Sequence, residues 1–219
     1  MPLRAPRRLD DDLVLYEGVT GAAERETALR RHLADRLGCP ESALRLDRDP
    51  RGKPRILMPT PRLRFSLARR ASLLLVATAW DAPIGADLER FEARRDELAV
   101  ARNFFAAGEL AWLASLEPAA RPEGFLMLWT GKEAVLKALG LGIAQGLVEP
   151  DFTPFLRRGR PLAATSPITA EAAGAGFALA WFRASTADGE ILAARARAAP
   201  RSRFAADCPA AARPPFRGS

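Results

Sequence analysis

The spacing of hydrophobic residues in the first part of the chain predicts one helix among several strands. Leu29, Leu33 and Leu37 recur at intervals of four and line one face of a helix, which Gly38 is expected to end. Short apolar segments bounded by turn residues are typical of strands. Such segments cover residues 13–19, 44–46, 55–57, 63–67, 73–80 and 84–89. The apolar run 73–80 is too short to cross a membrane, so we expect a buried strand there.

From Asp96 onwards the spacing of hydrophobic residues is that of helices, and later in the chain it is again that of strands. Helical patterns run from Asp96 to Leu116 and, after a proline-containing break, from Glu123 to Leu139, where Gly140 closes the helix. Strand patterns follow at residues 177–182 and 191–196. Beyond Ala198 the chain is mostly Ala, Pro and Arg, which leaves little to bury, so residues 199–219 are predicted to form a disordered tail.

The repeated order of helix and strands predicts an α+β fold. We expect two similar halves, each a helix packed on a small antiparallel sheet. The first half would cover residues 1–84 and the second residues 85–198. A chain of 219 residues has ample core for this arrangement.

Composition and charge narrow the class of protein. With 48% hydrophobic and 27% charged residues, the chain is typical of a soluble globular protein. The net charge of +7 is compatible with nucleic acid, but the arginines are spread along the whole length and form no single stripe. An acidic partner or an anionic small molecule fits the charge equally well. Cys39 and Cys208 have no metal or redox spacing and the first twelve residues lack a signal peptide, so a cytoplasmic location is expected.

Lysine is rare, and its three positions draw attention to two short segments. Among 33 basic residues only Lys53, Lys132 and Lys137 are lysines. An ammonium group is a compact point charge, whereas a guanidinium is a flat fork, so the two differ at a tight phosphate site. Either these lysines are required for such chemistry, or base composition has depleted lysine and left three by chance.

Three acidic residues in two segments indicate a hard-cation site. On an extended backbone Asp87 and Glu89 point the same way, which gives half of such a site or the solvated face of a strand. On a helix Trp129, Glu133 and Lys137 share one face, and the Glu and Lys alone would be an ordinary surface pair. Joined to the strand pair, Glu133 completes a pocket of three carboxylates. Mg²⁺ prefers oxygen ligands and shares its remaining positions with substrate phosphates.

Together these segments resemble the signature of the 4′-phosphopantetheinyl transferase superfamily, G-x-D-x-E followed by F-x-x-x-W-x-x-K-E-A-x-x-K-x-x-G. The matching residues are Gly85-Ala86-Asp87-Leu88-Glu89, then Phe125, Trp129-Thr130-Gly131-Lys132-Glu133-Ala134, Lys137 and Gly140. The upstream Gly52-Lys53-Pro54 is similar to the G-K-P element of the larger, Sfp-type branch. The match extends from Gly52 to Gly142, and the order of the motifs makes it specific.

The resemblance implies a transferase with its active site in the cleft between the two halves. Such enzymes move the phosphopantetheine arm of coenzyme A to a serine of an acyl or peptidyl carrier protein and release adenosine 3′,5′-bisphosphate. By analogy Asp87, Glu89 and Glu133 would hold magnesium, and Glu133 and Lys137 would be catalytic. The implied coenzyme A ligands are Lys53, Pro54, Arg69, Arg70, Lys132 and Lys137. Either Glu133 or a water molecule on the metal would take the proton of the carrier serine.

One stretch departs from the family pattern. The Sfp-type branch shows F-N-x-S-H, whose Ser and His contact the 3′-phosphate of coenzyme A, but residues 65–70 read Phe-Ser-Leu-Ala-Arg-Arg. Ala68 and Arg69 thus replace the Ser and the His. Arg69 is expected to bind the phosphate instead, since a guanidinium forms paired, charge-assisted hydrogen bonds. Arg70 would contact phosphate or face water.

Two other classes of protein are considered beside the enzyme. One is a relative whose coenzyme A pocket has decayed, so that it binds without catalysis. The other is a basic nucleic-acid-binding module, but Asp87, Glu89 and Glu133 would repel a phosphate backbone. We therefore expect a magnesium-dependent monomeric transferase whose partners are coenzyme A and a carrier protein, with neither nucleic acid nor membrane.

Overall fold

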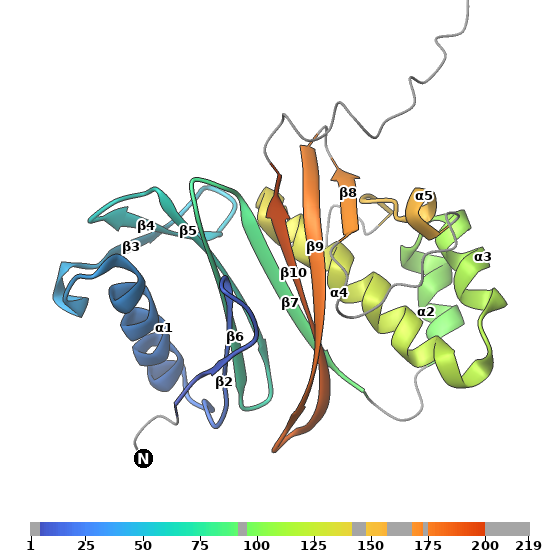
Figure 1. Ribbon diagram of the computed structural model, residues 1–219, viewed down its shortest axis with the longest axis horizontal. Helices are drawn as coiled ribbons and strands as arrows, with labels where there is room; N and C mark the ends of the chain where they lie inside the picture. Colours follow the sequence, from blue (N-terminus) through green and yellow to red (C-terminus); the bar gives the residue numbers. More distant parts are fainter. Residues whose placement is uncertain (1–4, 92–95, 142–147, 157–167, 173–174, 200–219) are drawn as a thin grey trace, which may run out of the picture.

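The computed structural model describes residues 5–91, 96–141, 148–156, 168–172 and 175–199. It confirms the predicted α+β class, because two four-stranded antiparallel sheets pack face to face with helices on their outer faces (Figure 1). The predicted tail lies, except for its first residue, outside the described residues. No helix in the described ranges is long and apolar enough to cross a membrane.

The first sheet has the strand order β1-β2-β6-β5. Its half of the chain contains β1 (Arg7–Arg8), β2 (Leu13–Tyr16), α1 (Ala22–Leu37), η1 (Glu41–Ala43), β3 (Arg45–Arg48), β4 (Pro54–Met58), β5 (Leu63–Arg70) and β6 (Leu73–Trp80). Helix α1 covers the outer face of this sheet, where Leu29 and Leu33 pack with Leu74 and Val76. The helix ends at Gly38, whose φ of 62° is left-handed, as predicted.

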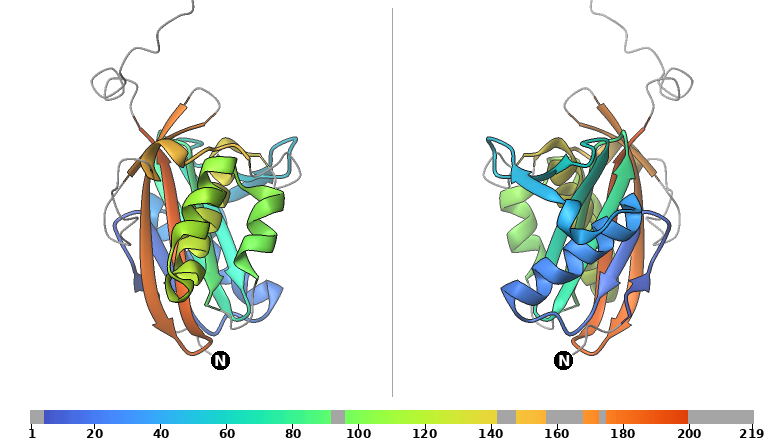
Figure 2. Two further views of the ribbon diagram at one scale, coloured as in Figure 1. Left: turned by 90° about the vertical axis from the view of Figure 1, so that its right-hand side faces the viewer. Right: turned by 90° about the vertical axis from the view of Figure 1, so that its left-hand side faces the viewer.

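The second sheet has the order β7-β10-β9-β8. Its elements are β7 (Ile84–Arg90), α2 (Glu97–Phe104), α3 (Ala107–Ser115), η2 (Pro118–Ala120), α4 (Arg121–Leu139), α5 (Thr153–Leu156), β8 (Ile168–Ala172), β9 (Ala175–Thr186) and β10 (Gly189–Ala198). The long helix α4 lies along the outer face of the sheet, and α2 and α3 lie beyond it (Figure 2). The chain passes from one sheet to the other at the turn between β6 and β7. The division into units 1–84 and 85–198 stays a prediction.

The sequence predicted the positions of most helices and strands, but not where some of the strands begin and end. The strand at 73–80 matches β6, whereas the strand predicted at 13–19 ends at Tyr16. Strands β9 and β10 are longer than predicted, and β8 carries no periodic signal that the sequence analysis recognised. These differences arise because strand length depends on the partner strand, which local periodicity does not show.

The two sheets meet through small apolar side chains. Ala68 and Ala77 of the first sheet and Ala86 and Ala193 of the second are buried in one cluster with Leu75. Burial of this surface is the main favourable contribution to holding the halves together.

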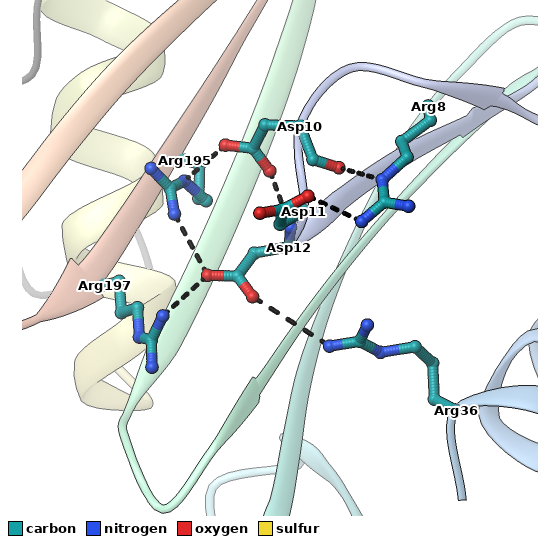
Figure 3. Close-up of polar contacts among 7 residues, drawn as sticks. All are labelled: Arg8, Asp10, Asp11, Asp12, Arg36, Arg195 and Arg197. Carbon is teal, nitrogen blue, oxygen red and sulfur yellow. Dashed lines mark hydrogen bonds and ion pairs between the residues drawn. The ribbon is translucent and has the colours of Figure 1, made fainter. Parts of the chain in front are cut away.

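An ion-pair network joins the start of the chain to the second sheet at one edge of this interface (Figure 3). Asp12, just before β2, accepts hydrogen bonds from Arg195 at 3.1 Å and Arg197 at 2.9 Å, both on β10. Arg36 of α1 lies 4.0 Å from its other carboxylate oxygen. Asp10 pairs with the Nε of Arg195 at 3.2 Å. The carboxylate of Asp12 thus connects the start of β2 and helix α1 with β10, which lies near the other end of the described chain.

The Asp12→Asn substitution should therefore destabilise the protein. Only 12% of the Asp12 side chain is exposed, so its loss leaves partly buried guanidinium groups with too little negative charge. We expect the free energy of unfolding in urea to fall by about 1 to 3 kcal/mol. Asp11→Asn is the matched control, because that side chain is 95% exposed and, within the described ranges, pairs with Arg8 alone. Equal destabilisation by both variants would contradict this account.

The chain's single histidine should make stability depend on pH. His32 on α1 is 8% exposed, and its Nε2 has no hydrogen-bond partner among the described residues. Burial, and next the charge of Arg36, lower the pKa of His32 from 6.5 to about 4. Between these values the unfolded chain binds a proton that the folded protein does not. The contribution of His32 to stability is therefore fully present above pH 6.5 and is lost as the pH falls towards 4.

The contribution of His32 should amount to about 2 kcal/mol between pH 7 and pH 5. The measurement is the free energy of unfolding in urea at both pH values for the wild type and for His32→Phe. The variant cannot titrate at this position, so its loss of stability over this range should be smaller by that amount. Identical pH dependence in the two proteins would show that His32 does not carry the effect.

Candidate active site

The predicted catalytic side chains meet where α4 crosses β7. Glu133 and Lys137 lie one turn apart on α4, and Asp87 lies on β7. The ammonium of Lys137 is 2.6 Å from Oδ1 of Asp87 and 3.7 Å from Oε2 of Glu133. Asp87 and Glu133 are both buried, whereas about a third of the Lys137 side chain is exposed. The structure thus forms a cluster of two carboxylates around one ammonium.

A close backbone contact at Gly85 produces this cluster. A Cβ at this position would lie 1.8 Å from the carbonyl oxygen of Ala134 and 2.5 Å from the amide nitrogen of Ala138, both on α4. Only glycine leaves room for the two backbones to approach so closely. Because side chains alternate along a strand, Asp87 then faces α4 as Gly85 does.

The carboxylates lack sufficient positive charge for their degree of burial. Burial first, and then the charge of Glu133, raise the pKa of Asp87 to about 7, although Lys137 opposes the shift. The pKa of Glu133 is also raised, by burial and then by the charge of Glu89, against the effects of Lys137 and the Trp129 indole. An additional cation would stabilise both ionised groups.

The third carboxylate, Glu89, pairs with a cation from the other half of the chain. Its Oε2 lies 3.3 Å from Nε of Arg70, the last residue of β5. Across the described ranges, no group of three His, Cys, Asp or Glu side chains is placed so that it could hold a metal ion. The three predicted ligands are thus not arranged as a metal site, but they lie close enough for their charges to affect one another, with Lys137 and Arg70 beside them. Within that part of the chain Oδ2 of Asp87 is buried and has no hydrogen-bond partner.

A pocket of about 230 Å³ lies next to this cluster, between the two halves. Lys53, Pro54 and Ser66 line it from the first half, and Lys137 and Leu141 from the second. Lys53 and Pro54 thus line a pocket, and their contacts with coenzyme A stay a prediction. The pocket has room for part of a small molecule beside Lys137.

The ammonium of Lys53 nevertheless points into the protein. It donates to the carbonyl oxygens of Ile84 and Ala138, each at 3.2 Å, and to that of Lys137. Burial lowers the pKa of Lys53 to about 8. A cation at the C-terminal end of α4 satisfies carbonyls that have no partner inside the helix. Lys53 thus fastens the first half to α4, a role that the sequence did not reveal.

The structure contradicts the prediction that Lys132 binds the cofactor. The residue is fully buried on the side of α4 away from Lys137, with its ammonium 2.7 Å from Oε2 of Glu109 and 2.6 Å from the carbonyl oxygen of Pro150. Glu109 also accepts hydrogen bonds from the amides of Ala106 and Phe152. This pair connects α3, α4 and the segment before α5 inside the second half, where a ligand does not reach it.

Arg69 and Arg70 lie on opposite faces of β5. Arg69 is directly paired with Leu74, whose side chain packs under α1, and it is exposed. Arg70 is paired with Leu73, which lies in the interface between the sheets. The structure therefore brings Arg70 to the carboxylates but does not bring Arg69 there. The phosphate-binding role predicted for Arg69 stays a prediction.

Ser66 also lines the pocket, although its sequence position did not predict a role there. Its hydroxyl accepts a hydrogen bond from the amide of Ala86 at 3.2 Å and thus joins β5 to β7 beside the pocket. The signal was a small polar residue inside an otherwise apolar strand, in the stretch that departs from the family pattern.

Comparison with known proteins identifies the family. The family model described as the 4′-phosphopantetheinyl transferase superfamily matches residues 83–193, and the chain belongs to that superfamily. The matched region contains β7 and α4, and therefore Asp87, Glu89, Glu133 and Lys137.

Individual relatives agree with this assignment. A protein of Synechocystis sp., slr0495, provisionally named a 4′-phosphopantetheinyl transferase, is 39% identical over 57% of this chain and 52% of its own length. The 4′-phosphopantetheinyl transferase psf-1 of Bacillus pumilus is 34% identical over 56% of this chain and 51% of its own length. HetI of Nostoc sp., named for the same activity, is 35% identical over 53% and 50%. The chain spans about half the length of the curated relatives it matches.

The Gly85→Ala substitution should disrupt the site through its backbone. The new methyl group must displace α4, so the free energy of unfolding measured in urea should fall by about 3 kcal/mol. Gly21→Ala adds the same group where the nearest side-chain atom is 3.7 Å away, and should cost about 1 kcal/mol at most. Equal stability of the Gly85 variant and the wild type would refute the close contact.

Proposed function

We propose that this protein transfers the 4′-phosphopantetheine arm of coenzyme A to a serine hydroxyl of an acyl or peptidyl carrier protein, with release of adenosine 3′,5′-bisphosphate. The observation that carries the proposal is the buried cluster of Asp87, Glu133 and Lys137 beside a pocket between the halves. Membership of the superfamily supports the same reaction.

The chemistry of the three carboxylates fits a magnesium ion, although they are not arranged around one point in this structure. Asp87, Glu89 and Glu133 would hold it, since carboxylate oxygens are its preferred protein ligands. Oδ2 of Asp87 is a buried oxygen without a hydrogen-bond partner among the described residues, and the raised pKa values of Asp87 and Glu133 reflect a shortage of positive charge. When bound, Mg²⁺ supplies neutralisation of the charge on the pyrophosphate of coenzyme A.

The side chains of the cluster have complementary roles in this proposal. Lys137 lines the pocket and is partly exposed, so its ammonium can stabilise the phosphate oxygen that departs with the nucleotide. Either Glu133, which lies one helical turn from Lys137, or a water molecule on the metal would accept the serine proton in this proposal. Lys53 holds the end of α4, and thereby positions Lys137.

The net charge of the protein and the walls of the pocket support the proposed carrier-protein partner and a monomeric active form. Carrier proteins are usually acidic, and the net charge of +7 would speed their encounter with this protein. Both walls of the pocket come from one chain, which supports a monomer as the active form. The cytoplasmic location stays a prediction from the pattern of cysteines.

The proposal is tested by incubating the protein with an apo acyl carrier protein, coenzyme A and MgCl₂, and measuring the carrier by mass spectrometry. We expect the mass of one phosphopantetheine arm to be added, and its addition to stop when EDTA removes the metal. Glu133→Gln and Lys137→Ala should each slow transfer by about 100-fold or more.

Glu123→Gln provides the control for this experiment. Glu123 lies in the first turn of the same helix, is partly exposed and lies 3.5 Å from Arg183, its one ion-pair partner in the part of the chain that the structure describes. Its loss should leave the rate unchanged. Transfer at the wild-type rate by Glu133→Gln, or no added mass with any of several apo acyl and peptidyl carriers, would refute the proposed function.

A further inference from the structure

Among the described residues, two cations lie beside the three carboxylates. Lys137 lies between Asp87 and Glu133, and Arg70 lies beside Glu89. The Glu89 side chain is only 16% exposed, whereas that of Arg70 is 39% exposed. The guanidinium is thus partly in solvent while the carboxylate is mostly withdrawn from it. Such a carboxylate needs a cationic partner, and in this structure Arg70 provides one.

Arg70 comes from the other half of the chain. It ends β5 in the first sheet, and Glu89 lies near the end of β7 in the second. The pair therefore bridges the two halves beside the carboxylate cluster, whereas the pocket lies on the other side of Lys137 and neither Arg70 nor Glu89 lines it. Arg69, the preceding residue, carries the same charge but lies on the opposite face of β5.

A guanidinium and a divalent ion compete for the same carboxylate oxygens. Rupture of the pair by the ion costs the free energy of the ion pair, which lowers the apparent affinity for the metal. An anion that takes over the displaced guanidinium recovers part of that cost, since Arg binds phosphate oxygens with charge-assisted hydrogen bonds. The divalent ion and the anion, linked in this way, raise each other's affinity for the protein by the same factor.

We propose that Arg70 is the counter-ion of Glu89 in the metal-free protein and couples metal binding to binding of the phosphates of coenzyme A. This inference rests on the proposed function. Arg70 is a positioning residue in this role, because it acts on the reaction through Glu89. It keeps the carboxylate neutralised until the metal and the anionic co-substrate arrive together.

The test is calorimetric titration of the full-length protein with MgCl₂ in the absence and presence of coenzyme A, without a carrier protein. For Arg70→Gln we expect Mg²⁺ to bind about 3 to 10-fold more tightly than to the wild type when coenzyme A is absent, because a competing cation has been removed. Coenzyme A should tighten Mg²⁺ binding to the wild type, and do so at least about 3-fold less in Arg70→Gln.

Two variants control for charge and folding. Arg69→Gln removes the same charge from the neighbouring position, and its affinity for Mg²⁺ without coenzyme A should equal that of the wild type. Arg70→Lys keeps the charge, so its affinity for Mg²⁺ should stay within about 2-fold of the wild type. Thermal unfolding of each variant confirms that it is folded before titration.

The outcomes separate this inference from the proposed function. If the wild type transfers the arm and binds Mg²⁺, but Arg70→Gln binds Mg²⁺ no more tightly, the role of Arg70 is refuted and the function stands. If Arg70→Gln weakens coenzyme A binding with unchanged Mg²⁺ affinity, Arg70 is only a phosphate ligand, and the coupling is refuted. If the wild type neither binds Mg²⁺ nor transfers the arm, both proposals fall.

Discussion

The site depends on the contact between the backbones of β7 and α4. Gly85 allows these backbones to touch, and Asp87, two residues further along, is consequently buried beside Lys137. Burial of a carboxylate is costly, and one ammonium offsets this cost only partly, because the pKa of Asp87 remains at about 7. The close packing that orders the two elements therefore also leaves a deficit of positive charge. That deficit is the physical basis for proposing a cation at this position.

The three lysines show why a compact ammonium is retained in an arginine-rich chain. Lys53 donates to three carbonyl oxygens, Lys132 is enclosed between Glu109 and the carbonyl of Pro150, and Lys137 lies between two carboxylates. Each ammonium group lies among several acceptors in a compact space. A planar guanidinium has a different shape and would not fit that space in the same way. The rarity of lysine was thus informative, but two of the three lysines serve the interior of the protein, whereas the sequence had suggested phosphate binding for all three.

Much of the fold and part of the site could be read from the sequence. Hydrophobic period located α1, β6 and α4, and glycines marked the ends of both helices at Gly38 and Gly140. Spacing along α4 placed Glu133 and Lys137 on one face, and the motif order indicated the superfamily. The faces of β5 could not be assigned in this way, because alternation shows that Arg69 and Arg70 point apart but does not show which of them faces the other sheet.

The sequence by itself determined the elements, the family and the set of residue types available for chemistry, because these depend on local periodicity and on the order of short motifs. Tertiary structure alone decided the surroundings of each charge: Lys132 is sealed against Glu109, Lys53 closes the end of α4, and Arg70 reaches Glu89. These partners lie far apart along the chain. Their pairing follows from how the sheets and helices bury each other, and burial decides which charges must find a partner inside the protein.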